Sequence, residues 1–100
     1  MFCEKEVCKQ IAKQFVDEVQ TEKVDNISIA GKKRIYQNKF WIVELDFDVH
    51  ATNPWVVILT YKRHPSKVSL WTTKTKYFRL YEDALRFYEE VINEIKFRRS

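Results

Sequence analysis

A run near the middle of the chain, residues 55–61, most constrains what this sequence can fold into. It reads Trp-Val-Val-Ile-Leu-Thr-Tyr, so it is apolar at nearly every position. Successive side chains of a β-strand point to opposite faces of its sheet, so an apolar residue at nearly every position is typical of a strand covered on both faces. We therefore expect residues 55–61 to form a central strand.

The preceding run, residues 40–49, alternates between apolar and acidic side chains, with Trp41, Val43, Leu45, Phe47 and Val49 on one face and Glu44, Asp46 and Asp48 on the other. This period of two predicts a strand with one buried face and one largely wet face. A more weakly alternating run, residues 27–36, comes before it. The short Gln37-Asn38-Lys39 segment between the two runs predicts a hairpin turn.

A fourth strand is expected at residues 68–75, which are rich in β-branched side chains and follow a second tight hairpin at residues 62–67. In this strand Trp71 would share a face with Ser69, Thr73 and Thr75. A tryptophan among small hydroxyl side chains is a candidate for an exposed platform on the sheet.

Helical periodicity marks both ends of the chain. In residues 4–21, Val7, Ile11, Phe15 and Val19 recur every four positions, and residues 80–98 contain two neighbouring apolar rows of the same kind. The apolar stripe of the second helix is wider than one sheet usually needs. This helix is therefore either wedged between the sheet and the first helix, or packed with its second row on another subunit.

These elements predict one α+β domain over residues 1–100: a helix, a four-stranded antiparallel meander and a second helix, with both helices on one sheet face. A single glycine and two prolines leave little material for long linkers. We also expect a homodimer, formed through the C-terminal helix or the exposed sheet.

Positive charge is concentrated in the predicted sheet. Residues 27–79 contain ten lysines or arginines and three acids, whereas the whole chain has a net charge of +4. The flanking segments are mildly acidic. This asymmetry favours a surface that binds a polyanion.

Basic residues interleaved with aromatic rings favour single-stranded nucleic acid, because phosphates pair with the cations and unstacked bases pack on the rings. We expect low sequence specificity, with Trp71, Tyr77 and Phe40 stacking bases. The candidate binding residues are Lys32, Lys33, Arg34, Lys39, Phe40, Lys62, Arg63, Lys67, Trp71, Lys74, Lys76, Tyr77 and Arg79. The choice between DNA and RNA stays open.

Two alternatives remain beside this hypothesis. The same aromatic residues could form a protein-interaction or self-assembly surface with no role in nucleic-acid binding. More weakly, Glu44, Asp46 and Asp48 could bind a divalent cation for phosphodiester cleavage, but Thr60 stands two positions before Lys62, where a strand-borne nuclease would offer an acid.

Other catalytic sites find little support in the sequence, and we expect no enzyme activity, cofactor, structural metal or small-molecule substrate. Gly31 is the only glycine, so no glycine-rich phosphate loop is possible. The two histidines, His50 and His64, fall in separate predicted turns, and Cys3 and Cys8 lack the spacing of a zinc knuckle.

The expected location is cytoplasmic. No apolar run approaches the length of a membrane span, and the first residues lack the pattern of a secretory signal. Cys3 and Cys8 are five positions apart, which separates them widely around a helix and makes a disulfide between them geometrically poor. Two free thiols would suit a reducing compartment.

Overall fold

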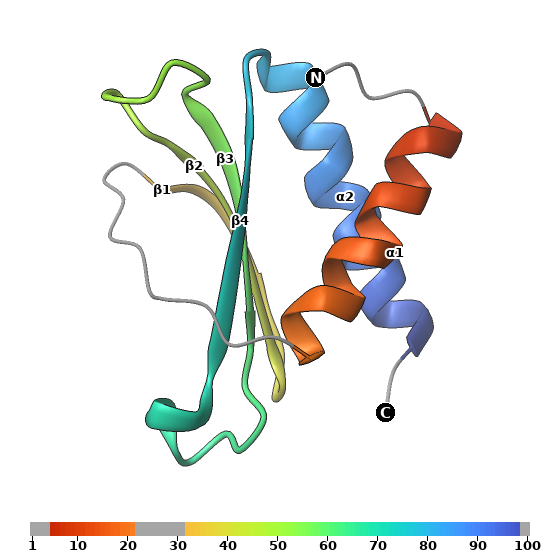
Figure 1. Cartoon of the computed structure of the whole chain (residues 1–100), viewed down its shortest axis with the longest axis vertical. Helices are drawn as coiled ribbons and strands as arrows, with labels where there is room; N and C mark the ends of the chain where they lie inside the picture. The colour runs from red at the N-terminus through yellow and green to blue at the C-terminus, as the bar shows by residue number, and fades with distance from the viewer. Residues whose placement is uncertain (1–4, 22–31, 99–100) are drawn as a thin grey trace.

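Four antiparallel strands form one sheet, and their order in the sheet follows their order in the chain. The computed structural model describes residues 5–21 and 32–98 (Figure 1). Helix α1 (Lys5–Thr21) comes first, the strands follow, and helix α2 (Tyr81–Arg98) ends the described chain. The strands are β1 (Lys32–Gln37), β2 (Trp41–Phe47), β3 (Trp55–Tyr61) and β4 (Thr72–Phe78). The predicted α+β order and antiparallel meander are confirmed.

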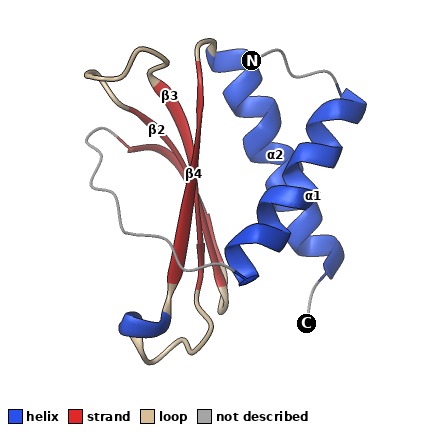
Figure 2. Ribbon diagram, viewed as in Figure 1, coloured by secondary structure: helices blue, strands red, loops and turns tan. Residues whose placement is uncertain are grey.

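Both helices lie on the same side of the sheet (Figure 2). The core between these two layers contains Val43 and Leu45 of β2, Val57 and Leu59 of β3, and Phe78 of β4, all fully buried. These residues alternate along their strands with residues of the other face, as the pleat of a strand requires. The expected placement of the helices is therefore confirmed.

Helix α2 packs against both the sheet and α1, and this explains its wide apolar stripe. The ring of Phe87 lies 5.2 Å from Phe15 of α1 and 5.2 Å from Phe78 of β4. Members of its second row, Leu85 and Ile92, are partly buried against the same core. Of the two explanations that the sequence left open, packing within one chain accounts for this stripe.

The fourth strand was predicted too early in the chain. Val68–Leu70 form a short 3-10 helix, and β4 begins at Thr72. The register explains the shift, because β4 pairs with β3 from Tyr61↔Thr72 to Trp55↔Phe78. Trp71 consequently lies in the connection before the strand, and the predicted platform of Trp71 with small hydroxyls on a sheet face is wrong.

Strand β3 is buried on both faces, as its composition predicted. Val57 and Leu59 face the helices, while Val56 and Ile58 are buried on the other side of the sheet. On that same side Asp46 is only 2% exposed, so the expectation of a largely wet face is wrong at this position. Asp46 belongs to an inner strand, pairing with Lys32 in β1 and with Val56 in β3.

Cys8 is fully buried in the first helix and is bonded in a disulfide, which contradicts the expectation of two free thiols. The geometric argument against a disulfide assumed that both cysteines lie on one helix, and the structure describes that helix only from Lys5 onward. Cys3 lies outside the described residues. The thiol argument for a reducing compartment therefore fails, and the cytoplasmic location stays a prediction.

Neither described helix has the length and apolar character that crossing a membrane requires.

Candidate nucleic-acid interface

The connection between β1 and β2 is a tight turn organised by the side chain of Asn38. Its Oδ1 accepts hydrogen bonds from the backbone N–H groups of Phe40 and Trp41, each at 2.9 Å. The backbone N–H of Asn38 donates to the Trp41 carbonyl at 2.9 Å. Asparagine favours such turns because its side chain mimics a backbone acceptor. The turn places Lys39 and Phe40 at the end of the sheet.

The longer connection between β3 and β4 is fastened to the same end of the sheet. The backbone N–H of Lys62 donates to the Phe40 carbonyl at 2.7 Å, which joins the two connections. The guanidinium of Arg63 donates to the Gln20 carbonyl of α1 at 2.7 Å, and the indole N–H of Trp71 donates to the His64 carbonyl at 3.1 Å. Residues far apart in the chain therefore meet here.

Cations lie over aromatic rings throughout this end of the sheet. Among the described residues there are four such contacts, at 5.5 to 5.8 Å from cation to ring centre, and all four lie here. They pair Lys39 with Phe40, Lys62 with Trp71, Arg63 with Tyr61 and Lys96 with Tyr36. Each contact at such an exposed position contributes about 0.5 to 1 kcal/mol, which is enough to bias a flexible side chain towards its ring.

We use the term basic end for this end of the sheet together with the two connections and the last turns of α2. It carries five cations: Lys39, Lys62, Arg63, Lys67 and Lys96. Within the described part of the chain, none of the five forms an ion pair. Two other nearby cations do, since Lys74 contacts Glu18 at 2.7 Å and Arg98 contacts Asp17 at 2.7 Å. The charge of the basic end is therefore available to an anionic ligand.

Six of the predicted binding residues meet at this end: Lys39, Phe40, Lys62, Arg63, Lys67 and Trp71. Lys74 and Lys76 do not join them, because they lie on the helix-facing side of β4 together with Phe78. Tyr77 faces away from the helices, near the opposite end of the sheet, where Arg79 follows the last strand. The side chains of Lys32 and Lys33 lie outside the described residues.

Arg34 is also separate from the basic end. It lies on β1 beside α2, where a hydrogen bond to the hydroxyl of Tyr81 raises the pKa of its guanidinium. Tyr81 begins α2, whereas Lys96 lies in its last turns. The predicted cluster Lys32-Lys33-Arg34 therefore does not contribute a described side chain to the candidate interface.

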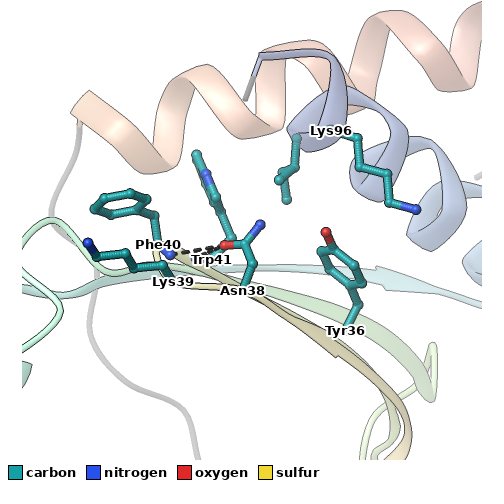
Figure 3. Close-up of a pocket in the computed structure, with 7 residues that line it drawn as sticks. Tyr36, Asn38, Lys39, Phe40, Trp41 and Lys96 are labelled. Carbon is teal, nitrogen blue, oxygen red and sulfur yellow. Dashed lines mark hydrogen bonds between the residues drawn. The ribbon is translucent and has the colours of Figure 1, made fainter. Parts of the chain in front are cut away.

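A pocket of about 610 Å³ opens between the first connection and α2, lined by Tyr36, Asn38, Lys39, Phe40, Trp41, Ile95 and Lys96 (Figure 3). Five of these residues, Tyr36, Asn38, Trp41, Ile95 and Lys96, were not predicted as binding residues. The only sequence signal for Lys96 was its position at a helix C-terminus, which favours a cation whether or not a ligand is present.

The carboxylates of β2 and of the turn after it do not form a metal centre. Asp46 is buried, and Oδ1 of Asp48 accepts a hydrogen bond from the His50 backbone N–H at 3.0 Å within the turn. Across the described residues, no group of three or more histidine, cysteine or acidic side chains is arranged to hold a metal ion.

Comparisons with protein-family models, with curated proteins and with solved structures found no match to this chain.

Proposed function

We propose that this protein binds single-stranded nucleic acid through the basic end, with little sequence specificity. The observation that carries the proposal is the set of four cation–ring pairs at one end of the sheet. Cations attract the phosphates of a nucleic-acid backbone, and aromatic faces pack against bases. Each pair places both kinds of contact within the reach of one nucleotide.

A single strand fits this surface better than a duplex. The faces of bases inside a duplex are stacked on one another and unavailable to side chains, whereas those of a single strand are open. Trp71, Phe40 and Tyr36 are all partly exposed and lie at the edge of the molecule. Every nucleotide has a phosphate and a base with a flat aromatic face. Contacts to these two groups therefore discriminate little between sequences.

The direct test is an anisotropy titration of the protein into labelled single strands and duplexes of DNA and RNA, at about 50 and about 200 mM salt. We expect single strands to bind more tightly than duplexes, and binding to weaken as the salt concentration rises. Failure to bind any single strand at the lower salt concentration would contradict the proposal. An affinity independent of salt would exclude phosphate contacts as its source.

Self-association as a homodimer is a second candidate, favoured by the exposure of Phe97 near the C-terminus of α2. Its side chain is 86% exposed, and Val68 in the second connection is 63% exposed. Sedimentation velocity over a wide concentration range tests this candidate. A wild-type dimer that becomes monomeric on the substitution Phe97→Ser would support this candidate. A wild-type protein that stays monomeric at every concentration up to the sub-millimolar range would contradict it.

A further inference from the structure

The pocket beside the first connection has rigid apolar walls. Trp41 is 6% exposed and Ile95 is 2% exposed, so both are fixed in the core and present only an edge to the pocket. The ring of Trp41 also packs against Tyr61, with centres 4.6 Å apart. Its volume of about 610 Å³ lies within the range of pockets that enclose small organic ligands.

Asn38 offers the pocket hydrogen-bond donors and no free acceptor. Because its Oδ1 already accepts two backbone N–H groups, the orientation of the amide is determined. The amide nitrogen consequently points between Trp41 and Tyr36, towards α2 (Figure 3). A ligand beside it must present an acceptor, and every nucleobase has carbonyl oxygens or ring nitrogens that can serve as one.

Two lysines flank the pocket from opposite sides. Lys39 lies beside Phe40 at one side, and Lys96 lies above the ring of Tyr36 at the other (Figure 3). A nucleotide inside a strand likewise has one phosphate on each side of its sugar. An uncharged ligand would make no use of these cations, whereas a nucleotide matches both the aromatic walls and the two positive charges.

We propose that this pocket holds one nucleotide of the bound strand, with its base between the aromatic side chains. The amide of Asn38 donates to an acceptor on the base, and Lys39 and Lys96 contact the two flanking phosphates. This inference rests on the proposed function and adds a defined subsite to it. The rest of the strand follows the other cations of the basic end.

The test is the substitution Asn38→Asp, which keeps the oxygen that organises the turn and replaces the amide donor by a carboxylate. Asn53→Asp is the matched control, because Asn53 is an exposed residue of the connection between β2 and β3, at the opposite end of the sheet. We expect N38D to weaken single-strand binding by about tenfold more than N53D, since a lost hydrogen bond and an added repulsion act together. Circular dichroism checks that both variants fold.

A second measurement separates this inference from the proposed function. In the wild-type protein, the side-chain amide resonances of Asn38 should shift on titration with a nucleoside 3′,5′-bisphosphate, and more weakly with a 5′-monophosphate. Equal strand affinities of N38D and N53D would overturn the pocket while leaving the proposed function intact. If no strand binds at all, a shift of the Asn38 amide still supports a nucleotide site, and its absence at millimolar nucleotide overturns it.

The exposed Lys96 provides a variant that does not disturb the turn, should N38D fail to fold. We expect Lys96→Gln to lower the slope of binding against salt concentration by about one phosphate contact, whereas Lys9→Gln on the outer side of α1 leaves it unchanged. Identical slopes for the two variants would exclude Lys96 from the site.

Discussion

The two ends of the sheet both carry aromatic clusters, yet only one of them is a candidate binding surface. At the basic end Trp41 packs on Tyr61, with ring centres 4.6 Å apart. At the opposite end Trp55 lies 4.8 Å from Phe47 and 4.8 Å from Tyr81. Aromatic residues alone therefore do not distinguish the two ends.

The described charges do distinguish them. The opposite end carries Arg79 after β4, but also three acids: Asp48 after β2, and Glu82 and Asp83 in the first turn of α2. Acidic residues in that position stabilise the helix through its dipole and would repel a phosphate. The comparison leads to the prediction that aromatic rings of this protein contact a nucleic acid only where unpaired cations lie beside them.

The largest expected effect comes from reversing charge at the basic end. The double substitution Lys62→Glu with Arg63→Glu should weaken single-strand binding at low salt by about a hundredfold, because it replaces two attractions with two repulsions. The matched control is Lys9→Glu with Lys13→Glu, which makes the same change in net charge on exposed positions of α1. Anisotropy titrations compare the two. Equal losses would mean that only net charge matters and would end the distinction between regions.

Removing a ring without changing charge should have a somewhat smaller effect. Trp71→Ala is expected to weaken single-strand binding by about 1 to 3 kcal/mol if the indole stacks on a base. The hydrogen bond from Trp71 to the His64 carbonyl is lost as well, so thermal unfolding must be measured alongside binding. An unchanged affinity in a folded variant would remove Trp71 from the site.

Replacing acids of the opposite end by lysines should sharpen the comparison further. Glu82→Lys with Asp83→Lys would surround Trp55 and Tyr81 with positive charge, and we expect binding to strengthen by about threefold to tenfold. Helix stability should fall by roughly 0.3 to 1 kcal/mol for each substitution, because lysine opposes the dipole at a helix N-terminus. Calorimetric stoichiometry and thermal unfolding measure the two effects. No gain in binding would show that cations beside rings are insufficient.

The smallest expected effect is a change in the pKa of Tyr77, which reports the negative electrostatic potential at the opposite end of the sheet. Burial raises the pKa of the Tyr77 phenol, and the carboxylate of Asp48 raises it further. Asp48→Asn keeps an acceptor oxygen for the turn but removes the charge, so the pKa should fall towards its ordinary value. Absorbance at high pH follows the ionisation of the phenol. An unchanged titration would mean that Asp48 does not contribute to the field at Tyr77.

The same shift has a defined effect on stability. The pKa of Tyr77 is higher in the folded than in the unfolded chain, so the folded state retains this proton more strongly. Its contribution to stability is complete below the unfolded pKa of about 10 and is lost as pH rises through the folded pKa. Asp48→Asn should therefore reduce the loss of stability above about pH 10. Chemical denaturation at neutral and alkaline pH measures this difference.

Where the sequence predicted the fold well, a local pattern carried the information. Residues 55–61 are apolar on both faces because β3 lies inside the sheet and is buried on both sides. The error in β4 arose because Val68-Ser69-Leu70 has the composition of a strand, while the position of a strand depends on its partner. That partner fixes Thr72 opposite Tyr61, and no local pattern reports this register.

The candidate site was harder to predict because it joins distant segments. Lys96 and Tyr36 come together only through the packing of α2 on the sheet. Conversely, Arg34 and Lys39 are only five positions apart in the chain. Arg34 lies in the first half of β1, whereas Lys39 lies in the turn after this strand, and only Lys39 reaches the basic end. A count of charges along the sequence does not show at which end of the sheet each charged residue lies.

The hydrogen bond from Lys62 to the carbonyl of Phe40 also bears on how quickly a ligand could be captured. It joins the two connections before any ligand arrives, so this part of the protein has less conformational entropy to lose on binding. We expect the association rate at such a preorganised surface to depend on electrostatic steering. The dissociation rate should depend on how many stacking contacts between bases and aromatic side chains must break at the same time. A short oligonucleotide should consequently arrive about as fast as a long one and stay for less time.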